Sequence, residues 1–342
     1  METEKMFKGS PKYFELTAGE ISNEIYHSMN FPTRCGFKCI KCALPGSCGR
    51  AVGNLLTTDQ NIEILNKVKK IGKRALVIMG LGEPTAGFSL VKPVIKAAND
   101  REFITIMFTT LYDLDISQAE FYQDNNVTLF ISLDSLDKNM YRSLTGGGDL
   151  KHVRRNIDVI RSVYRNTPEK IGDQKIVRMG FNVTLCRQNK DEINLIRDFT
   201  TEDEIFVVNP PMKLGRLENL AAWKMLVGDD EGYEELKNLA RLHSDTGGQS
   251  SLTKKRICGY CDLGTANDID GQILFPCSYA RKSGLWLPNI MDLTSTQFLK
   301  LSQKLKVLMH QLIQTFGITS SCPVRDEAFF QTLMKRLKEL KL

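Results

Sequence analysis

Short apolar runs alternate with helically spaced apolar positions along residues 20–210. The apolar runs, which predict strands, are residues 25–30, 75–79, 103–108, 127–133, 177–185 and 204–209. The helical spacing covers residues 59–71, 89–99, 116–124, 149–165 and 190–200. Strands separated by helices indicate βα units, a parallel sheet and right-handed crossovers. Continuously apolar strands are typical of a sheet covered by helices, and such folds carry their functional residues at the carboxyl ends of the strands.

The pattern changes after Pro210-Pro211. Residues 216–243 read as a charged helical connector, and 244–256 have the composition of a flexible loop. Residues 257–290 are short of strands and rich in Gly and Cys, as in a small subdomain organised by metal. Amphipathic helices are expected over the last stretches, 294–316 and 324–342. We expect three parts, with the bounds 1–215 (barrel and N-terminal extension), 216–256 (connector and loop) and 257–342 (C-terminal subdomain).

Composition narrows the class of protein. The 342 residues are 42% hydrophobic and 25% charged, which excludes disorder and low-complexity scaffolds. No apolar run approaches the roughly 18 residues of a membrane span. The charged N-terminal sequence is unlike a secretory signal, so we expect a cytoplasmic protein. The net charge of +6 is scattered, which argues against nucleic acid as partner and is compatible with an anionic small substrate.

Nine cysteines, an odd number without an export signal, argue against a disulfide framework. The first group, Cys35, Cys39 and Cys42, directly follows the first expected strand. Three thiolates on one short loop can hold three corners of a [4Fe–4S] cluster and leave one iron open. A zinc site is the alternative, but structural zinc normally takes four ligands. Cys48 is either a fourth ligand or an ordinary thiol.

The second group is Cys258, Cys261 and Cys277. Between the last two, Asp270-Gly271 predicts the turn of a β-hairpin that returns Cys277 to the Cys258-x-x-Cys261 pair. Cys322 can supply a fourth ligand. Four thiolates would close a second iron–sulfur cluster or a zinc site, and without Cys322 one iron would stay open.

Several motifs occur in the same order as in a known family. They are Cys35-x3-Cys39-x2-Cys42, Leu81-Gly82-Glu83-Pro84, Ile131-Ser132-Leu133-Asp134-Ser135, Leu144-Thr145-Gly146-Gly147-Gly148-Asp149 and Val208-Asn209-Pro210-Pro211 with Gly215-Arg216. Together they resemble the radical S-adenosylmethionine (SAM) superfamily over about residues 20–280. The resemblance implies a partial (β/α)6 barrel, an open iron that binds SAM, and a reducing partner such as flavodoxin or ferredoxin. One electron would cleave SAM to methionine and a 5′-deoxyadenosyl radical, which abstracts hydrogen from the substrate.

The resemblance also implies roles for single residues. Backbone groups at Gly82, Glu83 and Pro84 would receive the SAM amino group, and Ser132 and Asp134 would hold the ribose. The further cofactor-binding candidates are Asn182, Asn209 and Phe37. The family often has an aromatic residue before the last cysteine of the loop, and Lys41 stands there instead, which leaves adenine packing unassigned. The three glycines 146–148 are either an anion cradle or a loop before a capped helix.

The C-terminal hairpin resembles the SPASM and twitch subdomains of radical SAM enzymes, and the number of cysteines implies one auxiliary [4Fe–4S] cluster. The cysteine order is also similar to that of the cyclic pyranopterin synthases, in which three cysteines leave an iron open for a purine. The chain does not end in their Gly-Gly, so we expect a different enzyme.

Cys186 ends the fifth expected strand, where a thiol can return a hydrogen atom to a substrate radical. A small buried hydrophobic residue is the alternative. We therefore expect a radical SAM oxidoreductase or epimerase acting on a small molecule such as a sugar, a cyclitol or another natural product. A peptide-modifying maturase is a second possibility, disfavoured because only 34 residues precede Cys35. A non-enzymatic, metal-binding interaction protein is the third.

Overall fold

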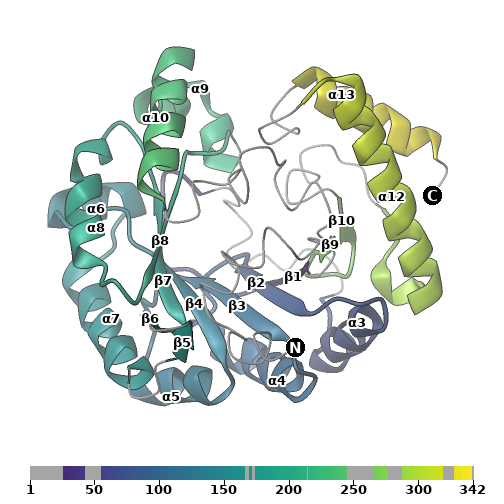
Figure 1. Ribbon diagram of the computed structural model, residues 1–342, viewed down its shortest axis with the longest axis horizontal. Coiled ribbons are helices and arrows are strands. Elements are labelled where there is room, and N and C mark those ends of the chain that lie inside the picture. The colour runs from purple at the N-terminus through teal and green to yellow at the C-terminus, as the bar shows by residue number, and fades with distance from the viewer. Residues whose placement is uncertain are drawn as a thin grey trace.

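The computed structural model describes residues 26–42, 55–165, 169–171, 174–213, 215–244, 265–275, 287–318 and 327–340. These residues form a curved sheet with helices along its outer side (Figure 1). The fold is α/β, a partial barrel, as expected. Across the same residues, none of the helices is both long and apolar enough to cross a membrane.

The main sheet has eight strands in the order β10-β9-β1-β2-β3-β4-β7-β8. Six of them pair in parallel and follow the expected runs to within two residues: β1 (Tyr26–Phe31), β2 (Ala75–Gly80), β3 (Ile104–Thr109), β4 (Val127–Ser132), β7 (Met179–Thr184) and β8 (Ile205–Asn209). Because all six run the same way, their carboxyl ends meet at one edge of the barrel.

Helices follow these strands and cover the outer face of the sheet (Figure 1). Their bounds are α3 (Thr58–Lys70), α4 (Phe88–Asp100), α5 (Ile116–Asp124), α6 (Lys138–Thr145), α7 (Leu150–Tyr164), α8 (Ile193–Phe199), α9 (Leu220–Leu226), α10 (Asp230–His243), α12 (Ser295–Thr315) and α13 (Glu327–Glu339). Short 3-10 helices are η2 (Lys190–Glu192), η3 (Gly215–Glu218) and η5 (Ile290–Asp292). The expected helices are confirmed, and α10, in the connector, packs against β8.

The structure differs from the sequence-based expectations in several local details. The sequence predicts Thr58 or Asp59 as the N-cap of this helix, but the cap of α3 is Thr57, which forms a capping box with Gln60. Helix α6 was missed because it has only eight residues, although Asp137 caps it through the amides of Asn139 and Met140. The separate hairpin β5 (Glu169–Ile171) and β6 (Gln174–Ile176) was also missed.

Both faces of the sheet are apolar, for different reasons. The outer face packs against the helices through residues such as Leu76, Met107 and Phe181. The concave face has its own small cluster, which includes Val77, Ile106 and Phe130. Burial on both sides explains why the strands show no alternation of polar and apolar residues.

The expected hairpin around Asp270-Gly271 is confirmed as β9 (Thr265–Asn267) and β10 (Ile273–Leu274). Gly271 occupies the turn with a φ of +88°. No pattern in the sequence predicts that β9 pairs in parallel with β1 and extends the barrel sheet.

His27 on β1 carries much of this junction. Its Nδ1 lies 2.9 Å from the Thr265 hydroxyl, and its Nε2 lies 2.8 Å from Asn267 Oδ1. Burial without a charged partner lowers the pKa of His27 to about 3, an effect that Lys73 reinforces and the Asn267 hydrogen bond opposes. The imidazole is therefore neutral, and it connects the first strand of the barrel to a segment about 240 residues away.

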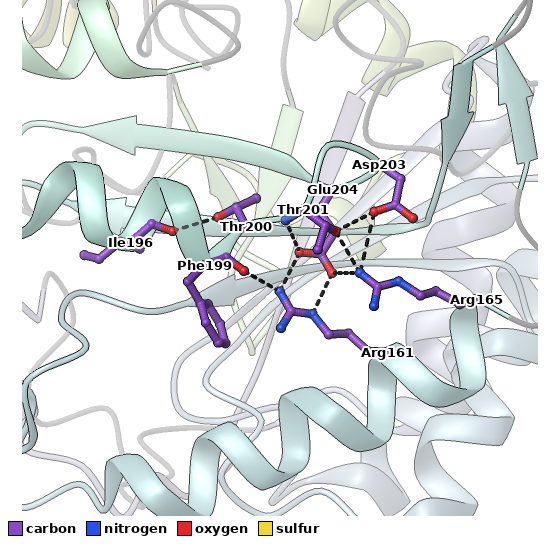
Figure 2. Close-up of polar contacts among 8 residues, drawn as sticks. All are labelled: Arg161, Arg165, Ile196, Phe199, Thr200, Thr201, Asp203 and Glu204. Carbon is purple, nitrogen blue, oxygen red and sulfur yellow. Dashed lines mark hydrogen bonds and ion pairs between the residues drawn. The ribbon is translucent and has the colours of Figure 1, made fainter.

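A second buried network lies at the amino-terminal end of β8 (Figure 2). Glu204 accepts bonds of 2.7 Å from both Nε and Nη2 of Arg161, and one of 3.0 Å from Arg165. The side chain of Glu204 is fully buried, and Arg161 also stacks over Phe199. This network belongs to the amino-terminal ends of the strands, away from the edge that carries the cysteine loop.

Candidate metal centre and cofactor site

The first cysteine group lies on a loop that leaves the carboxyl end of β1. We call residues Cys35–Cys42 the cysteine loop. Within the described chain, Cys35, Cys39 and Cys42 form no disulfide bond, and all three are partly buried. Phe37 is buried and packs edge-on against Tyr112, with ring centroids 4.8 Å apart, and more distantly against Tyr141. Its observed role is to fix the loop to the core, and cofactor contact by this ring stays a prediction.

The cysteine loop pairs with the end of α6. Its backbone amides at Lys38 and Ile40 donate to the carbonyl oxygens of Thr145 (2.9 Å) and Leu144 (3.1 Å). Gly146, at φ +66°, allows this approach, because a Cβ there would lie 2.5 Å from the Lys38 carbonyl oxygen. The structure thus gives the first glycine of the triplet a packing role against the loop.

Arg216 holds the same loop from the other side. Its backbone amide donates to the Cys42 carbonyl oxygen (3.1 Å), and its Nη1 donates to the Lys38 carbonyl oxygen (3.0 Å). The Gly215-Arg216 motif, at the start of η3, therefore lies against the cysteine loop. Contacts with α6 and η3 make the backbone of the cysteine loop a preorganised scaffold.

Lys41 reaches from the loop to the end of β4, where its ammonium group forms an ion pair with Asp134 Oδ1. The same oxygen accepts the backbone amide of Thr184 at 2.8 Å. Asp134 is therefore engaged by the protein through this oxygen, and a ribose contact by Asp134 stays a prediction. Sequence reasoning missed the pairing because the two residues are 93 positions apart.

The Gly-Glu-Pro turn follows β2 and packs directly on the chain between β1 and the cysteines. A Cβ on Gly82 would lie 1.8 Å from the carbonyl oxygen of Thr33. The Glu83 amide donates to the Arg34 carbonyl oxygen at 2.9 Å, one residue before the first cysteine. The glycine is thus required by close backbone approach. Glu83 and Pro84 are buried in this turn, and Gly82 is partly exposed.

The Glu83 carboxylate is bound by threonines. Its Oε1 accepts from the hydroxyl and amide of Thr85 (2.8 and 3.1 Å) and from the Thr109 hydroxyl, and its Oε2 accepts from the amide and hydroxyl of Thr110 (2.7 and 2.6 Å). Both oxygens of the carboxylate are therefore engaged by the protein. The carboxylate ties the turn to the end of β3, and the paired threonines after that strand were its overlooked signal.

Ser132, Asn182 and Asn209 lie near the carboxyl ends of the adjacent strands β4, β7 and β8. Ser132 is in register with Asn182, and Asn209 Nδ2 donates to Asn182 Oδ1 at 2.8 Å. The alternation along the strands places all three on the concave face, with Phe130 and Val207. Asn209 Oδ1 is buried without a hydrogen-bond partner among the described residues, so it can accept from a ligand.

Cys186, the expected hydrogen donor, is only 3% exposed and belongs to the main hydrophobic core. Its backbone amide donates to Asn189 Oδ1 at 2.7 Å. Burial raises the pKa of its thiol, so the hydrogen stays on sulfur. The surroundings are those of a small buried hydrophobic residue, and the donor role stays a prediction.

The thiol of Cys39 is protonated in the absence of metal. Burial raises the pKa of Cys39 to about 12; the Lys41 ammonium opposes this rise, and Asp134 and Cys42 add to it. Bound iron would displace the proton, as metals do with coordinating thiols.

The donor set fits an iron–sulfur cluster. Three cysteines share one short, anchored loop, and soft thiolates suit iron–sulfur clusters. In the part of the chain that the structure describes, no three His, Cys, Asp or Glu side chains converge on a single ion. Cys48 and the expected auxiliary ligands lie outside the described residues: Cys258, Cys261, Cys277 and Cys322.

Comparison with known proteins agrees with this site. Residues 29–199 match the radical SAM superfamily. The chain belongs to this superfamily, whose members carry a [4Fe–4S] cluster and bind SAM.

Two curated relatives give a nearer comparison. The probable GTP 3′,8-cyclase of Methanococcus maripaludis (strain C6) is 28% identical over 182 residues, which are 52% of this chain and 60% of that protein. The GTP 3′,8-cyclase of Pseudomonas syringae pv. syringae is 27% identical over 192 residues, 55% of this chain and 54% of that one. The chain thus spans little more than half the length of these relatives.

Solved structures share the fold. Streptococcus suis SuiB bound to its precursor peptide SuiA aligns with a TM-score of 0.58 at 18% identity, over 84% of this chain and 66% of SuiB. The protein anSMEcpe with bound AdoMet aligns with a TM-score of 0.54 at 15% identity, over 83% of both chains. At these identities the likeness concerns the fold alone.

Proposed function

We propose that this chain is a radical SAM enzyme that reductively cleaves S-adenosylmethionine and abstracts a hydrogen atom from a small-molecule substrate. One observation carries the proposal: the loop with Cys35, Cys39 and Cys42 is anchored beside the Gly82-Glu83 turn, through the Glu83 amide and the Arg34 carbonyl oxygen. Metal ligands and an open backbone turn thereby share one edge of the barrel.

The cysteines would hold three irons of a [4Fe–4S] cluster. When bound and reduced, the cluster supplies the electron that splits SAM into methionine and a 5′-deoxyadenosyl radical, which takes a hydrogen atom from the substrate. The backbone at Gly82 would receive the SAM amino group. Ser132, Asn182 and Asn209 would orient polar groups of SAM or substrate from the concave face.

The substrate class we propose is a sugar, a cyclitol or a related natural product. Oxidation is favoured over epimerisation, because Cys186, the thiol outside the metal loop in the described chain, is buried in the core. An auxiliary [4Fe–4S] cluster on Cys258, Cys261, Cys277 and Cys322 would accept the second electron or conduct it. A flavodoxin or ferredoxin would serve as the reductant in the cytoplasm.

A purine nucleotide is the second candidate substrate. The curated relatives are named GTP 3′,8-cyclases, and they match about half of this chain. The resulting reaction would rearrange the nucleotide without net oxidation. A peptide is the third candidate, since the structurally similar SuiB was solved with its precursor peptide.

The test is anaerobic. The reconstituted protein is analysed for iron, sulfide and zinc, then reduced and mixed with SAM, and 5′-deoxyadenosine is measured by mass spectrometry. The control replaces Cys35, Cys39 and Cys42 with Ala. We expect about eight irons per chain in the wild type if both clusters form, and formation of 5′-deoxyadenosine that the control abolishes. A protein that holds one or two zinc ions in place of iron contradicts the proposal.

The substrate is found in a second step. Candidate cyclitols, GTP and synthetic peptides are added in deuterated water, and an increase in 5′-deoxyadenosine above the SAM-only rate identifies the class. Incorporation of solvent deuterium into the product would indicate a thiol donor. Loss of that deuterium in Cys186→Ala would then assign the donor role that the burial of Cys186 argues against.

A further inference from the structure

A buried ion pair joins the cysteine loop to the end of β4. The side chains of Lys41 and Asp134 are 15% and 3% exposed. Ion pairs in this environment are poorly screened by solvent, so their charges act strongly on neighbouring groups. Lys41 also stands between two of the metal ligands, with Cys42 as the next residue.

The position of Asp134 is fixed independently of Lys41. Its carboxylate accepts the Thr184 amide, and its backbone carbonyl oxygen accepts Asn189 Nδ2 at 2.7 Å. The same Nδ2 lies 3.0 Å from the Thr184 carbonyl oxygen, and Asn189 is completely buried. Asp134 is therefore a rigid anchor between β4 and β7, to which the loop is attached by Lys41.

The backbone anchors of the loop bring no buried charge to it. Thr145, Leu144 and Arg216 reach carbonyl and amide groups of the loop, and the guanidinium of Arg216 is exposed where it does so. Lys41 brings a buried positive charge instead. Lys38, three residues earlier on the same loop, has an exposed side chain and provides a comparison within the same segment.

The two charges have opposite effects on a negative centre. A cation held near a thiolate-ligated cluster favours its more negative, reduced state, whereas a carboxylate favours the oxidised state. The pair therefore attaches the loop to β4 and also sets the electrostatic potential at the cysteines.

We propose that Lys41 is a positioning residue, held by Asp134, that keeps the cysteine loop in place and stabilises the reduced form of the cluster bound to Cys35, Cys39 and Cys42. The inference rests on the proposed function, because it needs an iron–sulfur cluster on this loop. It specifies that the lysine acts on the cluster through charge and that the aspartate acts in the opposite sense.

The test is a redox titration of the reconstituted protein. Electron paramagnetic resonance monitors the titration through the cluster signal that changes when SAM is added. Lys41→Gln removes the cation. We expect the ratio of reduced to oxidised cluster at a fixed potential to fall about tenfold, which corresponds to a shift of about 59 mV for one electron. Asp134→Asn should shift the potential in the positive direction. Lys41→Arg keeps the charge and should stay near the wild type.

The matched control is Lys38→Gln, which makes the same change of charge at an exposed position of the loop. It should shift the potential by much less than Lys41→Gln. Equal shifts in these two variants, or shifts of the same sign in Lys41→Gln and Asp134→Asn, would overturn the proposal, because a purely structural bond has no reason to distinguish the sign of the lost charge.

Iron content is measured for every variant. If Lys41→Gln does not retain iron, the charge-preserving Lys41→Arg should restore it, and so should the double variant Lys41→Gln/Asp134→Asn, which leaves no unpaired buried charge. Failure of both to restore iron counts against the inference. A wild type that holds iron and shows these shifts but cleaves no SAM refutes the proposed function alone.

Discussion

Gly82 and Thr33 lie in direct backbone contact: a Cβ atom on the glycine would be 1.8 Å from the threonine carbonyl oxygen. The contact joins the turn after β2 to the segment that leads into the cysteine loop. The turn and the cysteine loop are distant in the sequence but form one site in the structure.

Substitution of Gly82 by Ala should displace this turn. Overpacking against backbone costs about 1–3 kcal/mol, so we expect SAM affinity to fall about tenfold or more. Equilibrium binding of SAM to the reconstituted protein measures the effect. Gly36→Ala is the control within the cysteine loop, because a Cβ there meets none of the described residues within 4 Å. Equal affinity in the two variants would show that the close approach of Gly82 is unimportant.

Glu83→Gln should weaken the link between the turn and β3. One acceptor oxygen becomes an NH2 group that faces donors from Thr85 or Thr110. Each mismatched buried group costs about 1–3 kcal/mol, and we expect a decrease of that size in the free energy of unfolding. Urea denaturation measures it, with the exposed Glu120→Gln on α5 as control. A stability equal to that of the control would contradict the role of the carboxylate.

Glu204→Gln should destabilise the fold without altering the chemistry. The change leaves Arg161 and Arg165 without their shared carboxylate (Figure 2). Breaking a buried pair costs about 3–5 kcal/mol, whereas the control Asp203→Asn, at a partly exposed pair, should cost less than about 1 kcal/mol. SAM cleavage per folded molecule should match the wild type in both. A selective loss of cleavage would mean that this edge communicates with the site.

His27 predicts a dependence of stability on pH. The folded state keeps the imidazole neutral down to a pKa of about 3, whereas an unfolded histidine binds a proton below about 6.5. The unfolded state therefore binds more protons below that pH. The contribution of His27 is fully present above pH 6.5 and is lost as the pH falls towards 3, by about 1.4 kcal/mol per unit.

The measurement is urea denaturation at pH 7.5 and 5.5, for the wild type and His27→Gln. The wild type should lose about 1.4 kcal/mol more than the variant between the two values. Parallel pH profiles for the two proteins would show that the imidazole is accessible to protons in the folded state.

Much of the site was predictable, because its signals are local. The spacing of Cys35, Cys39 and Cys42 directly specifies three thiols on one loop, and Gly82 marks a close approach. Asn182 and Asn209 could be placed on one edge because parallel strands share their carboxyl ends. The hydrogen-bond partners of the site residues were not predictable. Glu83 is bound by three threonines, and the residues next to it in the sequence do not indicate that two of them are Thr109 and Thr110.

The sequence by itself determined the six parallel strands, the helices that cover them and the residue types of the metal loop, because periodicity and ligand spacing are properties of neighbouring residues. Only the tertiary structure decided that Lys41 pairs with Asp134, that His27 binds Asn267 and that β9 joins the sheet beside β1. These contacts span 93 to 240 residues. They depend on how the strand ends meet in the partial barrel, and no local pattern along the chain encodes that geometry.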